Sequence, residues 1–209
     1  MSKYEKANLK TNKIDIKNIL VEGESIIWTG KPKKKAFILN KAFTMLPIAL
    51  IWLLFDGTFI GLMIGSGEVK EMLWFMIPFF ALHLMPVWIW LGNTVTASKN
   101  WENTEYTVTD KRLIIISGFV GMNYQSIYYK DIKNVHLKVG IVDKMLGVGD
   151  IYFDTNEKVS AAFLDIENVY ELYPKFQKVV LDIQTDIEFP NNLRPKENDG
   201  YNTKYNSKF

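Results

Sequence analysis

Cysteine is absent from this chain of 209 residues, and histidine occurs only twice. Without cysteine the protein has no disulfides, no thiolate nucleophile and no thiolate-ligated metal site. No paired-carboxylate or nucleophile motif accompanies the two histidines, so we predict neither an enzyme nor a bound cofactor. A formal net charge of only +2 does not provide the concentrated basic face that nucleic acids require, and no nucleic-acid partner is expected.

Two long apolar runs dominate the first half of the chain. Residues 42–64 contain one charged residue, and residues 72–92 contain none at neutral pH. As helices, each run would be about 30 Å long, which is the thickness of a bilayer's hydrocarbon core. Neither run has the polar stripe of a helix buried in a soluble protein. Because the linker 65–71 is too short for a domain, we predict a transmembrane helical hairpin over residues 42–92, with bends at Pro47, Pro78 and Pro86.

Lysines lie mainly on one side of this hairpin. The linker holds only Lys70, between two glutamates, whereas six lysines lie just before the first run or after the second: Lys31, Lys33, Lys34, Lys35, Lys41 and Lys99. Positive charge stays on the cytoplasmic side, so we predict a multi-pass protein of the cell membrane with both termini inside. The first forty residues contain no early apolar segment, so the first run itself should direct insertion.

A small basic cluster, Lys31, Lys33, Lys34 and Lys35, immediately precedes the first run. It either sets only the orientation of the hairpin or also contacts anionic headgroups of the bilayer, which is the first expected partner.

Two ionisable residues fall inside the apolar runs. By helical rise, Asp56 lies about 12 Å and His83 about 16 Å from the outer end of its helix. An ionised aspartate in hydrocarbon costs at least ~2.5 kcal/mol and needs a partner, a proton or water. The matching depths predict a pair across the hairpin, which is either structural or part of a proton or ion site. A protonated Asp56 at a helix break near Gly57 is the other structural interpretation.

From residue 101 to 186 the pattern indicates a separate cytoplasmic domain. Alternating apolar and polar residues predict strands at 104–109, 113–117, 127–139, 150–154 and 159–166, with His136 on a solvated face. An apolar stripe over 169–183 predicts an amphipathic helix that covers the sheet, has Asp165 as a cap at its start, and is either kinked or opened in its second half by Pro174. In the N-terminal segment 1–41, we expect residues 19–32 to be a docking strap or a plain linker, with a short strand at residues 25–28. Residues 187–209 have few aliphatic side chains and are expected to be a disordered tail.

Glycines punctuate residues 140–149, which we interpret as a loop with turn glycines. Gly147 and Gly149 resemble a phosphate-binding loop only superficially, because a strand pattern and no helix follows them. The loop is a candidate interaction surface, represented by Gly140, Lys144, Gly147 and Gly149.

Short antiparallel strands closed by a C-terminal helix are the order of a pleckstrin-homology (PH) barrel. The segments EYTVTDKRLIIISGFVG, YYKDIKNVHL, MLGVGDIYF and GESIIWTGKP resemble the membrane-flanked bacterial PH-like family of the YdbS and YdbT type. The resemblance implies a membrane α-helical hairpin plus an α+β domain, a PH-like antiparallel barrel or sandwich with a helical cap, and no shared catalytic set. Phosphoinositide-binding PH domains carry several cations around their first hairpin turn, where this chain has only Lys111 and Arg112. Phosphoinositide binding is therefore not expected.

We expect a membrane-anchored, non-enzymatic interaction or assembly module. Its soluble domain would present a sheet edge or the 140–149 loop to a partner protein or to a second copy. The alternative is a small oligomeric transporter or proton or ion conductor that uses Asp56 and His83.

Overall fold

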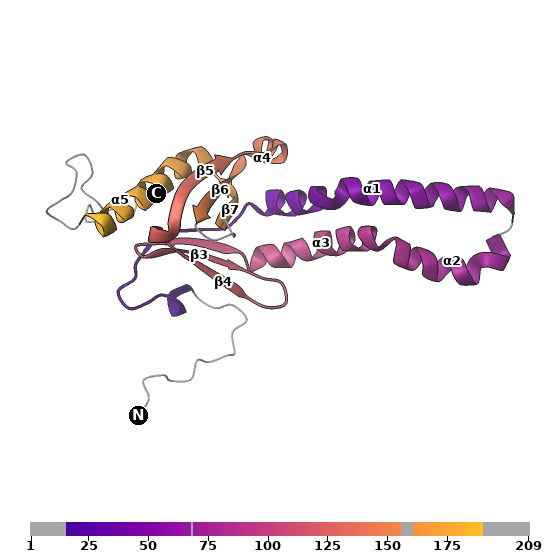
Figure 1. Ribbon diagram of the computed structural model, residues 1–209, viewed down its shortest axis with the longest axis horizontal. Helices are drawn as coiled ribbons and strands as arrows, with labels where there is room; N and C mark the ends of the chain where they lie inside the picture. The colour runs from indigo at the N-terminus through magenta and orange to yellow at the C-terminus, as the bar shows by residue number, and fades with distance from the viewer. Residues whose placement is uncertain (1–15, 68, 156–160, 190–209) are drawn as a thin grey trace, which may run out of the picture.

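A β-rich body and a long helical hairpin that projects from it make up the protein (Figure 1). The structure is a computed structural model and describes residues 16–67, 69–155 and 161–189. Residues 1–15, the start of the strand expected at 159–166 and the expected tail from residue 190 onward lie outside the described residues.

Three helices form the hairpin: α1 (Lys34–Ser66), α2 (Val69–His83) and α3 (Met85–Glu102). α1 continues through Pro47 and ends at Gly67, which has the left-handed φ of 78° that glycine adopts without strain. The second apolar run is not one helix, because α2 and α3 meet at an angle of 51° around Leu84. Pro86 lies in the first turn of α3, where its missing N–H costs no helical hydrogen bond, whereas α2 continues through Pro78 as one helix.

Two antiparallel sheets form the body. The first sheet has the order β1 (Ile26–Gly30), β2 (Glu105–Thr109), β3 (Arg112–Ser117) and β4 (Asn123–Tyr128). The second has the order β5 (Ile132–Lys138), β6 (Val148–Thr155) and β7 (Ala161–Glu167). Because β1 precedes the hairpin and pairs with β2 directly after it, the hairpin is an insertion between two neighbouring strands of one sheet. The predicted strap is thus an integral strand.

The expected single strand over 127–139 is wrong. The chain leaves the first sheet at the short 3-10 turn Tyr129–Asp131 and enters the second as β5. Tyr129 is buried there and its hydroxyl donates to the Thr109 carbonyl, so the turn fixes the crossing between the sheets. β4 was not predicted because Asn, Gln and Ser occupy three of its six positions.

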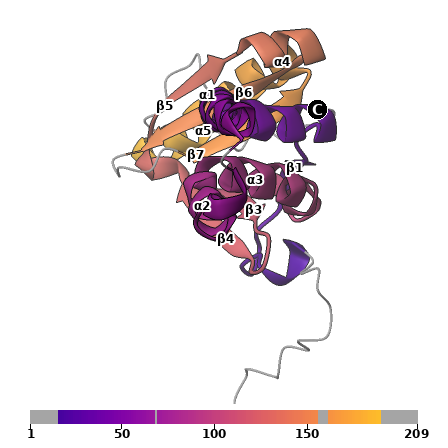
Figure 2. The same ribbon diagram turned by 90° about the vertical axis from the view of Figure 1, so that its right-hand side faces the viewer.

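α5 (Val169–Glu188) lies across the sheets as the closing element (Figures 1 and 2). It runs through Pro174 as one helix, and its N-cap is Asn168, not Asp165 as the sequence suggested. Its apolar face joins a core of aromatic and aliphatic side chains from both sheets, with Phe163 at the centre.

Candidate functional site

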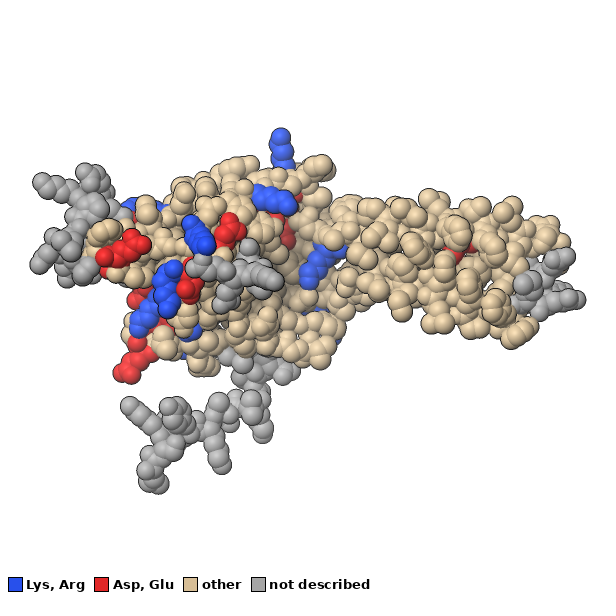
Figure 3. Space-filling view, in the orientation of Figure 1, with Lys and Arg blue, Asp and Glu red and all other residues tan. Residues whose placement is uncertain are grey.

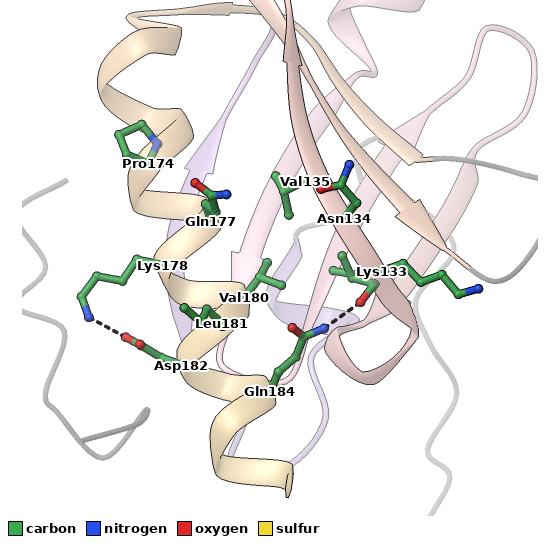
Figure 4. Close-up of a pocket in the computed structure, with 11 residues that line it drawn as sticks. Lys133, Asn134, Val135, Pro174, Gln177, Lys178, Val180, Leu181, Asp182 and Gln184 are labelled. Atoms are coloured by element: carbon green, nitrogen blue, oxygen red, sulfur yellow. Dashed lines mark hydrogen bonds and ion pairs between the residues drawn. The ribbon is translucent and has the colours of Figure 1, made fainter. Parts of the chain in front are cut away.

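A groove lies between β5 and α5 on the body. It has a volume of about 600 Å³ and is lined by four consecutive residues of β5 and by one side of α5. Figure 4 shows Val180, Leu181 and Gln177 on α5 and Val135 on the side of β5 that faces this helix, whereas the side chains of Lys133 and Asn134 point away from α5. β5 has a sheet neighbour on only one side in the described part of the chain, so the groove runs along a sheet edge.

Side chains of α5 bind backbone carbonyls of the first half of β5 and of the turn before it. Gln184 Nε2 donates to the Ile132 carbonyl at 2.7 Å and to the Tyr129 carbonyl at 2.9 Å. The Tyr173 hydroxyl donates to the Val135 carbonyl at 3.1 Å. These bonds occupy backbone carbonyls that an edge strand would otherwise offer to a strand of another chain. They bracket a short stretch at Lys133 and Asn134.

The structure brings Asp56 and His83 together within the hairpin. His83 Nδ1 lies 2.9 Å from Asp56 Oδ1 and 3.1 Å from Oδ2, and Asp56 is only 2% exposed. The rings of Trp52, Phe55 and Phe79 surround the imidazole. The predicted pairing is thus seen in the geometry, while a role for it stays a hypothesis.

Three of the four lysines of the basic cluster are bound within the protein. Lys33 Nζ donates to the Leu146 carbonyl and lies 2.8 Å from Glu167. Lys31 and Lys34 lie over the Trp101 ring at 5.6 and 4.9 Å. Only Lys35 is exposed without a described contact of this kind. The cluster thus joins the hairpin to the body, while Lys34 and Lys35 are exposed, and a contact with headgroups stays a prediction.

The expected loop at 140–149 is wrong in its secondary structure, because residues Ile141–Leu146 form helix α4. Gly140 is the N-cap, and its N–H donates to the Asp143 carboxylate at 2.8 Å; Gly147 ends the helix with a φ of 68°. Gly149 belongs to β6, and a Cβ there would lie 2.8 Å from Val169 Cγ1, so this glycine serves close packing. Only Lys144 is left as an exposed polar group of the predicted set.

A polar junction that the sequence did not reveal ties α1 to the body. Asn40 Nδ2 donates to Asp143 at 2.8 Å and to Asp165 at 2.6 Å, and the Asp165 N–H donates to Asp150 at 2.9 Å. The Lys33 N–H also donates to the Asp165 carbonyl. One sequence pattern could have revealed Asp143, namely a carboxylate three residues after a glycine that can act as a helix N-cap. Among the described residues no carboxylate group is arranged to hold a metal ion.

Burial raises the pKa of Asp165 to about 7; the Asn40 hydrogen bond opposes this rise, and the carboxylates of Asp150 and Asp143 add to it. The folded state therefore binds this proton more tightly than the unfolded chain does. Ionisation of Asp165 should destabilise the fold as pH rises from about 4, the ordinary aspartate pKa, towards neutrality.

We predict that Asp165→Asn flattens the pH dependence of stability between about pH 4 and 7. The lost slope is at most the one-proton limit of about 1.4 kcal/mol per pH unit. Asparagine tolerates the φ of 56° at this position. Denaturant unfolding of the full chain in detergent, measured across this range, tests the prediction. Asp131→Asn removes one partly exposed carboxylate as a control, and an unchanged slope in Asp165→Asn would contradict the prediction.

Two antiparallel sheets closed by a C-terminal helix define a PH-like domain, here interrupted by a helical hairpin. The sequence profile described as "Bacterial PH domain" matches residues 42–179. The chain therefore belongs to the bacterial PH domain family, as its sequence motifs predicted.

One solved structure gives a weaker similarity. It is a DUF1696 family protein with a pleckstrin-homology domain from Shewanella loihica PV-4, 18% identical, with a TM-score of 0.30. The match covers 38% of this chain and 69% of that one. A search of curated proteins finds no match.

Proposed function

We propose that this protein is a membrane-anchored PH-like module that binds a partner protein, without enzymatic activity, at the cytoplasmic face of the cell membrane. The hairpin is the observation that carries the anchoring. α1 is long and apolar enough to cross a membrane, and α2 with α3 passes the same test if the bent pair is one span.

The surface of the hairpin supports this proposal. Large apolar side chains are exposed along all of its length, among them Leu54, Leu62, Trp74 and Leu82. Figure 3 shows charged side chains gathered on the body and almost none on the visible face of the hairpin. An exposed apolar surface of this extent is not compatible with water and indicates a lipid or protein environment.

Cysteine accessibility tests the anchoring and the topology together. Because the chain has no cysteine, Ser66→Cys at the hairpin end and Ile187→Cys near the end of α5 are each unique labels. In intact cells a membrane-impermeant maleimide should label Ser66→Cys alone, and after permeabilisation it should label both. Labelling of Ile187→Cys in intact cells would contradict the proposal.

The groove between β5 and α5 supports the interaction part of the proposal. It offers two strand-edge residues that the hydrogen bonds from α5 leave open, Lys133 and Asn134, beside apolar side chains, and an extended peptide could pair with them. Main-chain hydrogen bonds to β5 would give affinity, and the wall formed by Val180 and Leu181 would select side chains of the partner.

Photocrosslinking tests this groove. Leu181 and Ile187 are both 57% exposed on α5, but only Leu181 lines the groove. A photoreactive residue at 181, introduced in the full chain in native membranes, should give a discrete adduct with a partner or a second copy. The same residue at 187 should give none. Absence of the adduct at 181, or equal adducts at both positions, would contradict groove binding.

A second candidate function, proton or ion conduction, is favoured by the Asp56–His83 contact inside an apolar hairpin. A polar crevice at the hairpin base includes Thr44 and Asn93. However, Thr44 is 12 residues before Asp56 on α1, which is roughly 18 Å along the helix. The crevice therefore does not reach the Asp56–His83 pair. Proton flux in vesicles should fall in Asp56→Asn and His83→Ala but not in the control Thr58→Val. Unchanged flux in all three would remove this function.

A further inference from the structure

An ordinary surface helix turns its apolar side chains towards the body and its charged side chains towards water. α4 has the opposite arrangement. Its carboxylate, Asp143, is buried against Asn40 of α1, whereas Ile141 and Met145 are 84% and 81% exposed. Ile141 and Met145 are four residues apart and therefore lie on the same face of the helix. An outward apolar face on so short a helix indicates that something other than water covers it.

The turn between β3 and β4 has the same character. Its residues Phe119 and Val120 are exposed, and Val120, at 93%, is among the most exposed apolar side chains described. Turn tips of this kind usually carry polar residues or glycine. Gly118, at the start of the turn, has a φ of 156°, and a Cβ there would lie 1.8 Å from the Gly121 carbonyl oxygen, so the turn has a fixed shape.

Both features lie at the base of the hairpin. Asn40 joins α4 to α1, and the Asn103 amide at the end of α3 donates to the Gly118 carbonyl at 3.1 Å. Viewed along the hairpin, α4 lies beyond α1 on one side, and β4 lies beyond α3 on the other (Figure 2). The two apolar tips therefore flank the hairpin where it leaves the body.

In a hairpin that crosses a bilayer, the length of α1 puts this base at the membrane surface. α1 has 33 residues and is about 50 Å long. A bilayer is about 40–45 Å thick with its headgroups. If the far end of α1 reaches the outer surface, its first turns, with Asn40, lie at the headgroups of the inner leaflet.

We propose that Ile141 and Met145 of α4, together with Phe119 and Val120 of the β3–β4 turn, form a membrane rim that inserts into the headgroup region of the leaflet next to the body. The inference rests on the proposed anchoring and adds a second, lateral contact with the same bilayer. The exposed Lys144 beside Met145 would keep its ammonium among the phosphates while its stem lies along the apolar boundary. Two contacts on opposite sides of the hairpin would fix the tilt of the body and hold the β5–α5 groove in one orientation to the membrane.

Single-cysteine labelling distinguishes this rim from the anchoring itself. The full chain carrying Val120→Cys, Met145→Cys, Ile187→Cys or Leu54→Cys is labelled with the fluorophore NBD and reconstituted into phosphatidylcholine–phosphatidylglycerol vesicles. Headgroup-spin-labelled and chain-spin-labelled phosphatidylcholines serve as quenchers. Ile187 is the matched control, because it is an exposed aliphatic residue near the end of α5 that lies away from the hairpin (Figure 1).

The rim labels should shift their emission to the blue and lose fluorescence most strongly with the headgroup quencher. The Leu54 label should be quenched most by the chain quencher, and the Ile187 label by neither. If the Leu54 label is quenched while the rim labels behave like that at Ile187, the rim is overturned and the anchoring stands. If the Leu54 label is not quenched either, both fail. The purified system contains no other protein, so quenching at the rim reports lipid alone.

Discussion

Replacing Arg112 with glutamine is expected to lower the free energy of unfolding by about 3–5 kcal/mol, because it leaves a buried carboxylate without its counter-charge. The Arg112 guanidinium donates to both oxygens of Glu24, from Nε at 3.0 Å and from Nη2 at 3.1 Å. The two side chains are only 11% and 0% exposed. Thr109 and the Val21 N–H also donate to Glu24, so the site is built around an ionised carboxylate.

The same pair makes the fold sensitive to acid. Burial raises the pKa of Glu24, but the hydrogen bonds from Arg112, Val21 and Thr109 and the charge of Arg112 outweigh it and hold this pKa below its ordinary value. The folded state thus favours the ionised form. This contribution to stability is present above the unfolded pKa of about 4.3 and is lost as pH falls through the folded value. Stability therefore falls with decreasing pH through Glu24, whereas it falls with increasing pH through Asp165.

Urea unfolding of the full chain in detergent, followed by tryptophan fluorescence, measures the effect. Lys175→Gln is the control, since its pair with Glu171 is exposed and such pairs contribute about 0–1 kcal/mol. The double variant Glu24→Gln, Arg112→Gln should recover part of the loss, because it removes the unpaired charge. Equal small losses in Arg112→Gln and Lys175→Gln would show that the pair does not stabilise the fold.

Arg112 also illustrates why sequence predicts a fold better than the environment of a side chain. The motif around the β2–β3 turn predicted both strands, and the absence of further cations there argued against a phosphoinositide site. It did not show that Arg112 turns inward to Glu24, or that Lys111 Nζ donates to the Glu22 carbonyl. Those contacts come from residues more than eighty positions away, beyond the reach of local patterns.

The extended apolar runs were the strongest sequence signal, and the structure has helices over both of them. The helical rise also gave matching depths for Asp56 and His83, because both depend only on residue counts within regular helices. Prediction failed where a tertiary contact overrides the local pattern. Residues 140–149 read as a loop, but the Asn40–Asp143 bond and the glycine N-cap stabilise a helix there. Asp165 was interpreted as a helix cap. Its actual partner, Asn40, is 125 positions away in the sequence, and no local pattern reveals that contact.

A pairing between strands far apart in the sequence also explains why the sequence did not assign β1 to the body. Sequence placed the body after residue 101, because a strand of five residues before the hairpin carries little pattern of its own. Its partner β2 was separated from it by the whole insertion. The hairpin is therefore held at both ends by neighbouring strands of one sheet, and a force on the hairpin acts directly on the first sheet.

Replacing Phe163 with alanine is expected to lower the free energy of unfolding by about 3–5 kcal/mol, the usual cost of removing a buried phenylalanine from a core. Phe163 is fully buried in β7. Its ring lies 4.8 Å from that of Tyr106, 5.0 Å from Phe153 and 5.8 Å from Phe176. These partners belong to β2, β6 and α5, so this one ring connects both sheets with the closing helix. Domains of this size have total stabilities of only about 5–15 kcal/mol.

The effect should be specific to the body of the protein. Unfolding in detergent should shift to much lower urea for the tertiary tryptophan signal, to which Trp28 contributes through its contact with Phe176. The helical signal of the hairpin should persist, because α1 does not draw its stability from this core. Tyr170→Ala, which removes an exposed aromatic ring of α5, is the matched control and should cost little. Loss of both signals together in Phe163→Ala would show that hairpin and body unfold as one cooperative unit, which the separate core and helical arm of this structure argue against.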